Sequence, residues 1–321
     1  MSKTKIFIKG LRTHYGVDAE EFELAAKNSI YVWWWRFLRL SPVLWYAKKT
    51  GLEPVDPNTR KVLAEGGQLF HGYFRDWWAK NSERLFAEPY GRKELKALSL
   101  EEARNHRFDR ASIIVEVPLS IPIERIMTDF NKILRDIHPG RHMNLAATSR
   151  AIWPLKSMRF RIDAVEKEYW SLLYKSLHPK LAAVRIGDRL QVAPHLKIRG
   201  TDWSENEHRY KSLNSIAGRY IYKGKFTLLN AERGSFPNSA PVNLPEDFLP
   251  FGKRHQEDFM NATSDDSTKP SAWRQWLSRN LEDDLKSYVY ERNNGGSKES
   301  STDLNTRKFL DFYRCKSDLF S

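Results

Sequence analysis

Residues 203–238 have the sequence WSENEHRYKSLNSIAGRYIYKGKFTLLNAERGSFPN, and we take this stretch as the organising element of the chain. Ser204 followed three positions later by Glu207 is a capping box, which predicts the start of a helix. Gly234 and then Pro237 predict its end. Apolar residues recur along this helix at steps of three and four and predict one side that packs on a core: Tyr210, Leu213, Ala217, Tyr220 and Ile221.

A second side of the same helix carries hydrogen-bond donors: His208, Ser212, Ser215, Arg219, Tyr222 and Lys223. The basic residues between 209 and 233 are Arg209, Lys211, Arg219, Lys223, Lys225 and Arg233. Glu232 is the sole acid in that interval. A helix with one apolar side and one cationic side fits a core on the first and a phosphate backbone on the second.

The overall composition predicts a folded, basic protein. With 321 residues we expect two domains and a tail, and eleven Trp predict large packed aromatic clusters. The formal net charge of +13 favours polyanions such as DNA, RNA or an anionic membrane surface, although a basic surface can also serve solubility alone. A single cysteine, Cys315, excludes an intrachain disulfide. No signal peptide and no run of roughly 18–20 apolar residues is found, so we expect a cytoplasmic protein without a membrane partner.

Residues 1–100 predict a helical, aromatic-rich domain. We expect a short strand over 5–9, a helix from Ala19 to Leu40, another from Ser41-Pro42 to Gly51, and further helices over 60–65 and 71–87. The consecutive residues Trp33–Trp35 point in three directions around a helix, which predicts burial on most sides. The alternative is that bases stack on exposed Trp side chains.

Residues 108–238 predict a second domain with a small α+β part. The pattern indicates a strand over 112–119, a helix that starts at Ser120 and Pro122 and ends at His138-Pro139-Gly140, a helix over 163–177, and an irregular strand over 151–155. Residues 186–194 resemble a helix-turn-helix element, in which Arg189 or Gln191 would reach base edges. Residues 239–321 predict a tail with flexible linkers and one helix over 271–290. The expected fold class is mainly α.

Motifs for cofactor chemistry are absent from the sequence: no C-x-x-C pair, no phosphate-binding loop and no G-x-G-x-x-G occurs, so we expect no cofactor or metal. His138 and His142 have a metal-ligand spacing, but Pro139-Gly140 breaks the helix that would align them. Two further candidates for catalysis remain. The spacing of His195 and Arg199 is similar to that of a tyrosine recombinase, in which Tyr220 or Tyr222 would be the nucleophile. The three acids Asp202, Glu205 and Glu207 could belong to a metal-dependent nuclease. Acids in a first helical turn explain that group more simply, and we expect a protein that is not an enzyme.

Several short segments carry a resemblance to other proteins. They are WWWRFLRLS at 33–41, WW at 77–78 with LFAE at 85–88, IGDRL at 186–190 and NAERGSFP at 230–237. In these segments the chain resembles uncharacterised proteins carried by prophages and integrative elements of proteobacteria, over residues 28–238. The resemblance implies a bacterial mobile element as the setting, where small basic proteins often act on DNA.

These observations predict a non-enzymatic protein that binds duplex DNA, in a regulatory or accessory role, with RNA as the other candidate polyanion. The basic residues between 209 and 233 are expected to contact phosphates, and Tyr222 is expected to belong to the same nucleic-acid-binding set. The alternative is a protein–protein interaction module of an element's control or defence system. In that case partners or self-association would involve the Trp-rich surfaces at Trp33–Trp35 and Trp273–Trp276. An enzyme of an unrecognised type is the third hypothesis.

Overall fold

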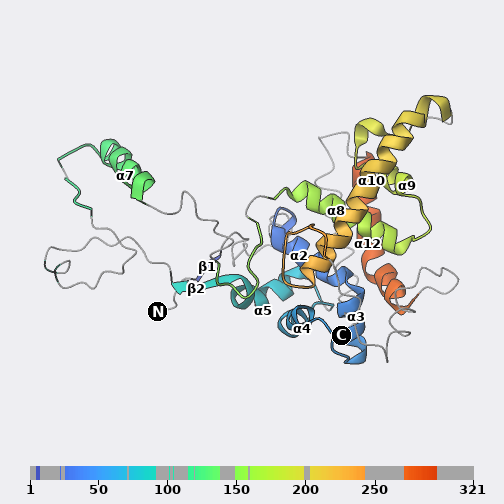
Figure 1. The fold of residues 1–321 in the computed structure, drawn as a ribbon, viewed down its shortest axis with the longest axis horizontal. Helices are drawn as coiled ribbons and strands as arrows, with labels where there is room; N and C mark the ends of the chain where they lie inside the picture. The colour runs from blue at the N-terminus through green and yellow to red at the C-terminus, as the bar shows by residue number, and fades with distance from the viewer. Residues whose placement is uncertain are drawn as a thin grey trace.

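The protein is mainly helical, as the sequence predicts (Figure 1). The computed structural model describes residues 5–7, 22, 26–70, 72–91, 101, 104, 115–118, 120–137, 149–157, 160–198, 203–242 and 271–294. Within this described part of the chain, no helix combines the length and apolarity that crossing a membrane requires.

The first part of the chain forms a group of short helices: α2 (Ile30–Leu40), α3 (Pro42–Thr50), α4 (Pro57–Glu65) and α5 (Phe74–Phe86). The prediction of one continuous helix from Ala19 to Leu40 is wrong, because the helix is interrupted at Ser29 and α2 begins after it. The hydroxyl of Ser29 accepts a hydrogen bond from the backbone N–H of Tyr31, and this cap starts a new helix. The Ser41 cap and the left-handed Gly51 of α3 confirm the predicted helix boundaries there.

Two short strands pair in antiparallel fashion: β1 (Lys5–Phe7) and β2 (Ala87–Gly91). The predicted strand over 5–9 is confirmed for the residues of β1. The expectation that residues 1–100 are otherwise helical is wrong for β2, where the chain extends directly after α5. Residues 115–118 form no strand, so the strand predicted over 112–119 is not found at its described positions.

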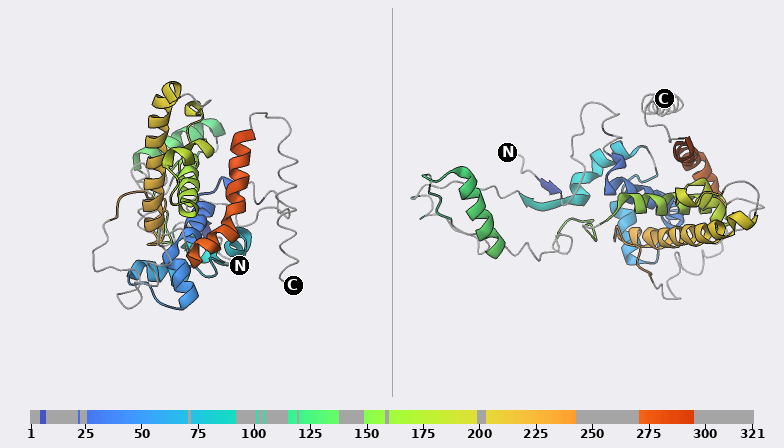
Figure 2. Two further views of the ribbon diagram at one scale, coloured as in Figure 1. Left: turned by 90° about the vertical axis from the view of Figure 1, so that its right-hand side faces the viewer. Right: turned by 90° about the horizontal axis from the view of Figure 1, so that it is seen from above.

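The second part of the chain contributes the longer helices. They are α7 (Ile123–Ile137), α8 (Ile162–Leu177), α9 (Ala183–Arg189), the 3-10 turn η2 (Pro194–Leu196), α10 (Trp203–Ala231) and α12 (Ala272–Asn294). Helix α8 packs against α2, α9, α10 and α12. Helix α7 lies away from this group and exposes Ile123 and Met127 (Figures 1 and 2).

A hydrophobic cluster rich in aromatic residues holds these helices together, apart from α7. Trp33, Trp34 and Trp35 are 2%, 0% and 5% exposed, so their predicted burial is confirmed and the stacking of bases on them is excluded. Trp34 stacks on Trp153 and on Phe236, with ring centroids 5.4 and 5.3 Å apart.

The cluster also reaches the helix of the predicted tail. Trp170 of α8 stacks on Tyr288 of α12, with ring centroids 4.7 Å apart. Trp273 is buried as well. The core therefore draws residues from all three predicted ranges, 1–100, 108–238 and 239–321, and that division stays a prediction. Of the Trp-rich surfaces predicted for self-association, Trp33–Trp35 is interior.

Candidate nucleic-acid interface

The inner side of α10 is fixed by close backbone packing. Leu213 and Ala217 are buried, and Tyr210, Tyr220 and Ile221 pack against the core while partly exposed, which confirms the predicted apolar stripe. At Gly224 an added Cβ would lie 2.6 Å from the backbone oxygen of Glu168, so α8 and α10 touch there. This contact leaves no room for a larger residue at position 224.

A buried polar pair crosses the same α8–α10 contact. The hydroxyl of Thr227 donates a hydrogen bond of 2.7 Å to the carboxyl group of Glu168, and both side chains are buried. Burial raises the pKa of Glu168, and the Thr227 hydrogen bond and the charge of Lys223 oppose that shift. Lys223 therefore lies at the border between the packed side of α10 and its solvent side.

The outer side of α10 is exposed and rich in donors. Of the predicted donor stripe, only Ser212 is partly buried, and the other members are exposed: His208, Ser215, Arg219, Tyr222 and Lys223. Lys211 and Lys225 are exposed too. The first turns of α10 extend beyond the neighbouring helices (Figures 1 and 2).

Most cations of this outer side form no ion pair with a carboxylate in the described part of the chain. Across the described residues, no ion pair involves Arg209, Arg219, Lys223 or Lys225, although Arg209 is partly buried. Lys211 differs, because its Nζ lies 2.6 Å from Glu207 one turn earlier. The hydrogen bond from Lys211 lowers the pKa of Glu207. Glu207 thus forms an ion pair with Lys211 on the exposed side of α10. The helix begins at Trp203, one residue before Ser204, which the sequence predicted as its cap.

Arg233 lies in a different environment from the other predicted phosphate contacts. Its Nε is 2.6 Å from Oδ2 of Asp56, the residue that caps α4, and the side chain is 22% exposed. Its neighbour Glu232 is 4% exposed. Burial raises the pKa of Glu232 to about 7, while a hydrogen bond with Ser41 and the charge of Arg233 oppose the rise. The prediction of a phosphate contact at Arg233 is corrected, because this guanidinium ties the end of α10 to α4.

The predicted helix-turn-helix element takes another form. Residues 186–194 contain the end of α9 and an irregular turn with Gln191 at a φ of 46°, and the next long helix begins only at Trp203. Arg189 donates a hydrogen bond of 2.6 Å to the hydroxyl of Tyr174. Gln191 hydrogen-bonds Asn293 of α12. In this arrangement both predicted base-reading residues engage neighbouring helices.

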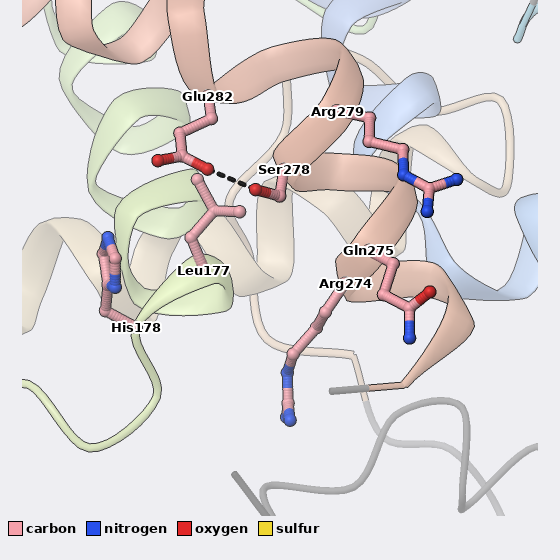
Figure 3. Close-up of a pocket in the computed structure, with 7 residues that line it drawn as sticks. All are labelled: Leu177, His178, Arg274, Gln275, Ser278, Arg279 and Glu282. Carbon is pink, nitrogen blue, oxygen red and sulfur yellow. Dashed lines mark hydrogen bonds between the residues drawn. The ribbon is translucent and has the colours of Figure 1, made fainter. Parts of the chain in front are cut away.

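A pocket of about 360 Å³ lies between the end of α8 and the start of α12 (Figure 3). It is lined by Leu177, His178, Arg274, Gln275, Ser278, Arg279 and Glu282. Ser278 donates a hydrogen bond to Glu282. Figure 3 shows His178 and Arg279 on opposite sides and the guanidinium of Arg274 directed away from Glu282. The charged groups do not converge on one point, so we assign no reaction to this pocket.

Only some of the residues that the sequence suggested for a recombinase, a nuclease or a metal site belong to the described part of the chain. His195 is exposed on η2, whereas Arg199, Asp202, His138 and His142 lie outside the described residues. Within the described ranges, no group of three His, Cys, Asp or Glu residues is arranged to hold a metal ion. Comparison of the chain with models of protein families, with curated proteins and with solved structures found no match.

Sequence reasoning missed three features of this region: the Gly224 contact, the Glu168–Thr227 pair and the Arg233–Asp56 ion pair. Gly224 and Thr227 share the apolar side of α10 with Leu213 and Ala217, and that shared spacing is the signal that could have placed them inside. No comparable signal exists for Asp56, which is distant in sequence from Arg233.

Proposed function

We propose that this protein binds nucleic acid, with duplex DNA as the ligand, through the outer side of α10. The observation that carries the proposal is a set of three exposed cations, Arg219, Lys223 and Lys225, which form no ion pair with any carboxylate among the described residues. They lie on a helix whose other side is fixed in the core. Phosphate groups would supply the missing negative charge, and contacts of this kind fix position without reading sequence.

The setting follows from the resemblance to proteins of prophages and integrative elements. A basic, non-enzymatic protein of such an element would have a regulatory or accessory role in the bacterial cytoplasm. The net charge of +13 supports attraction to DNA over the whole molecule as well as at α10.

An electrophoretic shift of duplex DNA at two salt concentrations tests the proposal. With about three phosphate contacts, affinity should fall roughly 40-fold between about 50 and 200 mM salt, because bound counterions are released on binding. The double variant Arg219→Glu/Lys223→Glu should abolish the shift, since it removes two contacts and places like charges against the phosphates.

The matched control changes the net charge by the same amount elsewhere. Lys48 and Lys49 are exposed at the end of α3, and Lys48→Glu/Lys49→Glu should retain most of the affinity. Equal losses in the two double variants would mean that only overall charge matters. An unchanged shift in Arg219→Glu/Lys223→Glu would overturn the assignment to α10.

The second candidate is a protein–protein interaction module, and α7 favours it. This helix exposes Ile123 and Met127, at 68% and 53%, on its apolar side. A variant with Ile123→Asp and Met127→Asp should then lose a co-purifying partner. Full retention of DNA binding in that variant, with loss of the partner, would separate the two candidates.

A further inference from the structure

Tyr222 is an exposed aromatic side chain in the middle of the cationic side of α10. It is 56% exposed, whereas most other aromatic residues in the described part of the chain are buried. Its ring contacts Phe226 one turn later in an edge-to-face arrangement, with centroids 4.8 Å apart and planes at 70°. Phe226 therefore holds the ring in place while leaving much of its surface open to solvent.

Gly218 lies one turn before Tyr222 on the same side of the helix. An added Cβ at Gly218 would meet nothing within 4 Å, so no neighbouring element requires a glycine there. Glycine weakens the interior of a helix relative to alanine. Its presence leaves bare backbone beside the Tyr222 ring, where a flat group could approach.

We infer that Tyr222 stacks on an unpaired base, so that the preferred ligand is a DNA duplex interrupted by unpaired nucleotides. This inference rests on the proposed function, because the surrounding Arg219, Lys223 and Lys225 must first hold the phosphate backbone. Those cations would suffice for an intact duplex, whose bases are closed to a ring on a helix surface. An unpaired base offers a free π-face, and every base type can stack on an aromatic side chain.

Tyr222 has a second chemical group, its hydroxyl, that could bind a phosphate instead. The two roles differ in what they need: stacking needs the ring, and a phosphate contact needs the hydroxyl. Phenylalanine keeps the first and lacks the second, so Tyr222→Phe distinguishes them, and Tyr222→Ala removes both.

The test measures affinity for two labelled DNAs of equal length, one an intact duplex and one with a short single-stranded gap. The wild-type protein should bind the gapped DNA about tenfold more tightly, within the range that one aromatic–base stack supplies. Tyr222→Ala should bind both DNAs equally, and Tyr222→Phe should keep the preference. Tyr290→Ala is the matched control, because Tyr290 is 61% exposed on α12, and it should behave as wild type.

Three results would overturn the inference while leaving duplex binding in place. They are equal wild-type affinity for the two DNAs, a preference that survives in Tyr222→Ala, and a loss of preference in Tyr222→Phe as complete as in Tyr222→Ala. Failure of the wild-type protein to bind either DNA would instead refute the proposed function, and this inference with it. The wild-type comparison does not depend on the folding of any variant.

Discussion

The two sides of α10 respond in opposite ways to the same small change. A methyl group added at Gly224 would meet the backbone of α8 at 2.6 Å, whereas one added at Gly218 would meet nothing. Both are glycines inside one helix, and in the sequence only the spacing of Gly224 from Leu213 and Ala217 distinguishes them. The comparison teaches that the inner side of α10 is fixed by packing against α8. On the outer side, the backbone at Gly218 has no such neighbour, so a ligand can approach it.

The carboxyl groups near the two sides of α10 have pKa values shifted in opposite directions. On the inner side and at the end of the helix, burial raises the pKa values of Glu168 and Glu232. On the outer side, Lys211 lowers the pKa of Glu207 in solvent. Carboxylates inside thus serve the fold, and the cations outside remain available.

The largest effect is expected from Gly224→Ala. The new methyl group must push α8 and α10 apart, and overpacking of this kind costs about 3 kcal/mol of the free energy of unfolding. Chemical denaturation followed by circular dichroism measures the loss. A variant as stable as the wild type would show that the two helices are not in close contact at this point.

The next effect concerns Glu232 and has a defined pH dependence. The folded pKa of about 7 exceeds the ordinary value of 4.5, so the folded state holds a proton that the unfolded state has released. The free energy of unfolding should therefore fall as pH rises from 4.5 to about 7, by up to about 3 kcal/mol from this group.

Glu232→Gln removes this titration, so its stability should exceed that of the wild type above pH 7 and approach it near pH 4.5. Denaturation midpoints of both proteins across that range provide the measurement. Glu207→Gln is the control on the outer side, where the lowered pKa predicts a small effect of opposite sign, present above the ordinary pKa and lost in acid. Parallel pH curves for wild type and Glu232→Gln would contradict the burial of this carboxyl group.

The smallest effect is expected from Gly218→Ala. Alanine gains about 0.5–1 kcal/mol of helix stability over glycine and, at this position, meets no neighbour. Thermal denaturation should show a modest rise in the midpoint, with affinity for intact duplex DNA unchanged. A lower midpoint would mean that another part of the chain covers the outer side.

The sequence predicts the course of α10 well, because its signals are local. Leu213 and Ala217 at a helical step predict the buried side, and Gly234 predicts the end. The burial of Trp33–Trp35 is likewise foreseeable, since three consecutive bulky side chains cannot all face solvent on one helix.

The features that escape prediction depend on distant partners. Arg233 looks like its basic neighbours in the sequence, and only the approach of Asp56 from α4 withdraws it from the surface. Ser29 is compatible with a helix interior as well as with a cap, and in the structure it caps α2. Strand β2 forms because β1 pairs with it, and a pattern within residues 87–91 alone does not reveal that.

The aromatic cluster has a consequence for how such a chain can evolve. Trp34 depends on Trp153 and Phe236, and Trp170 depends on Tyr288, so neither end of the chain carries a complete set of contacts. A recombination event that replaced one half of the chain by a foreign sequence would remove one partner of each of these aromatic pairs. The remaining partner would then face a cavity in the core. Variation in this protein is therefore expected to accumulate by point substitution on exposed faces rather than by exchange of long segments.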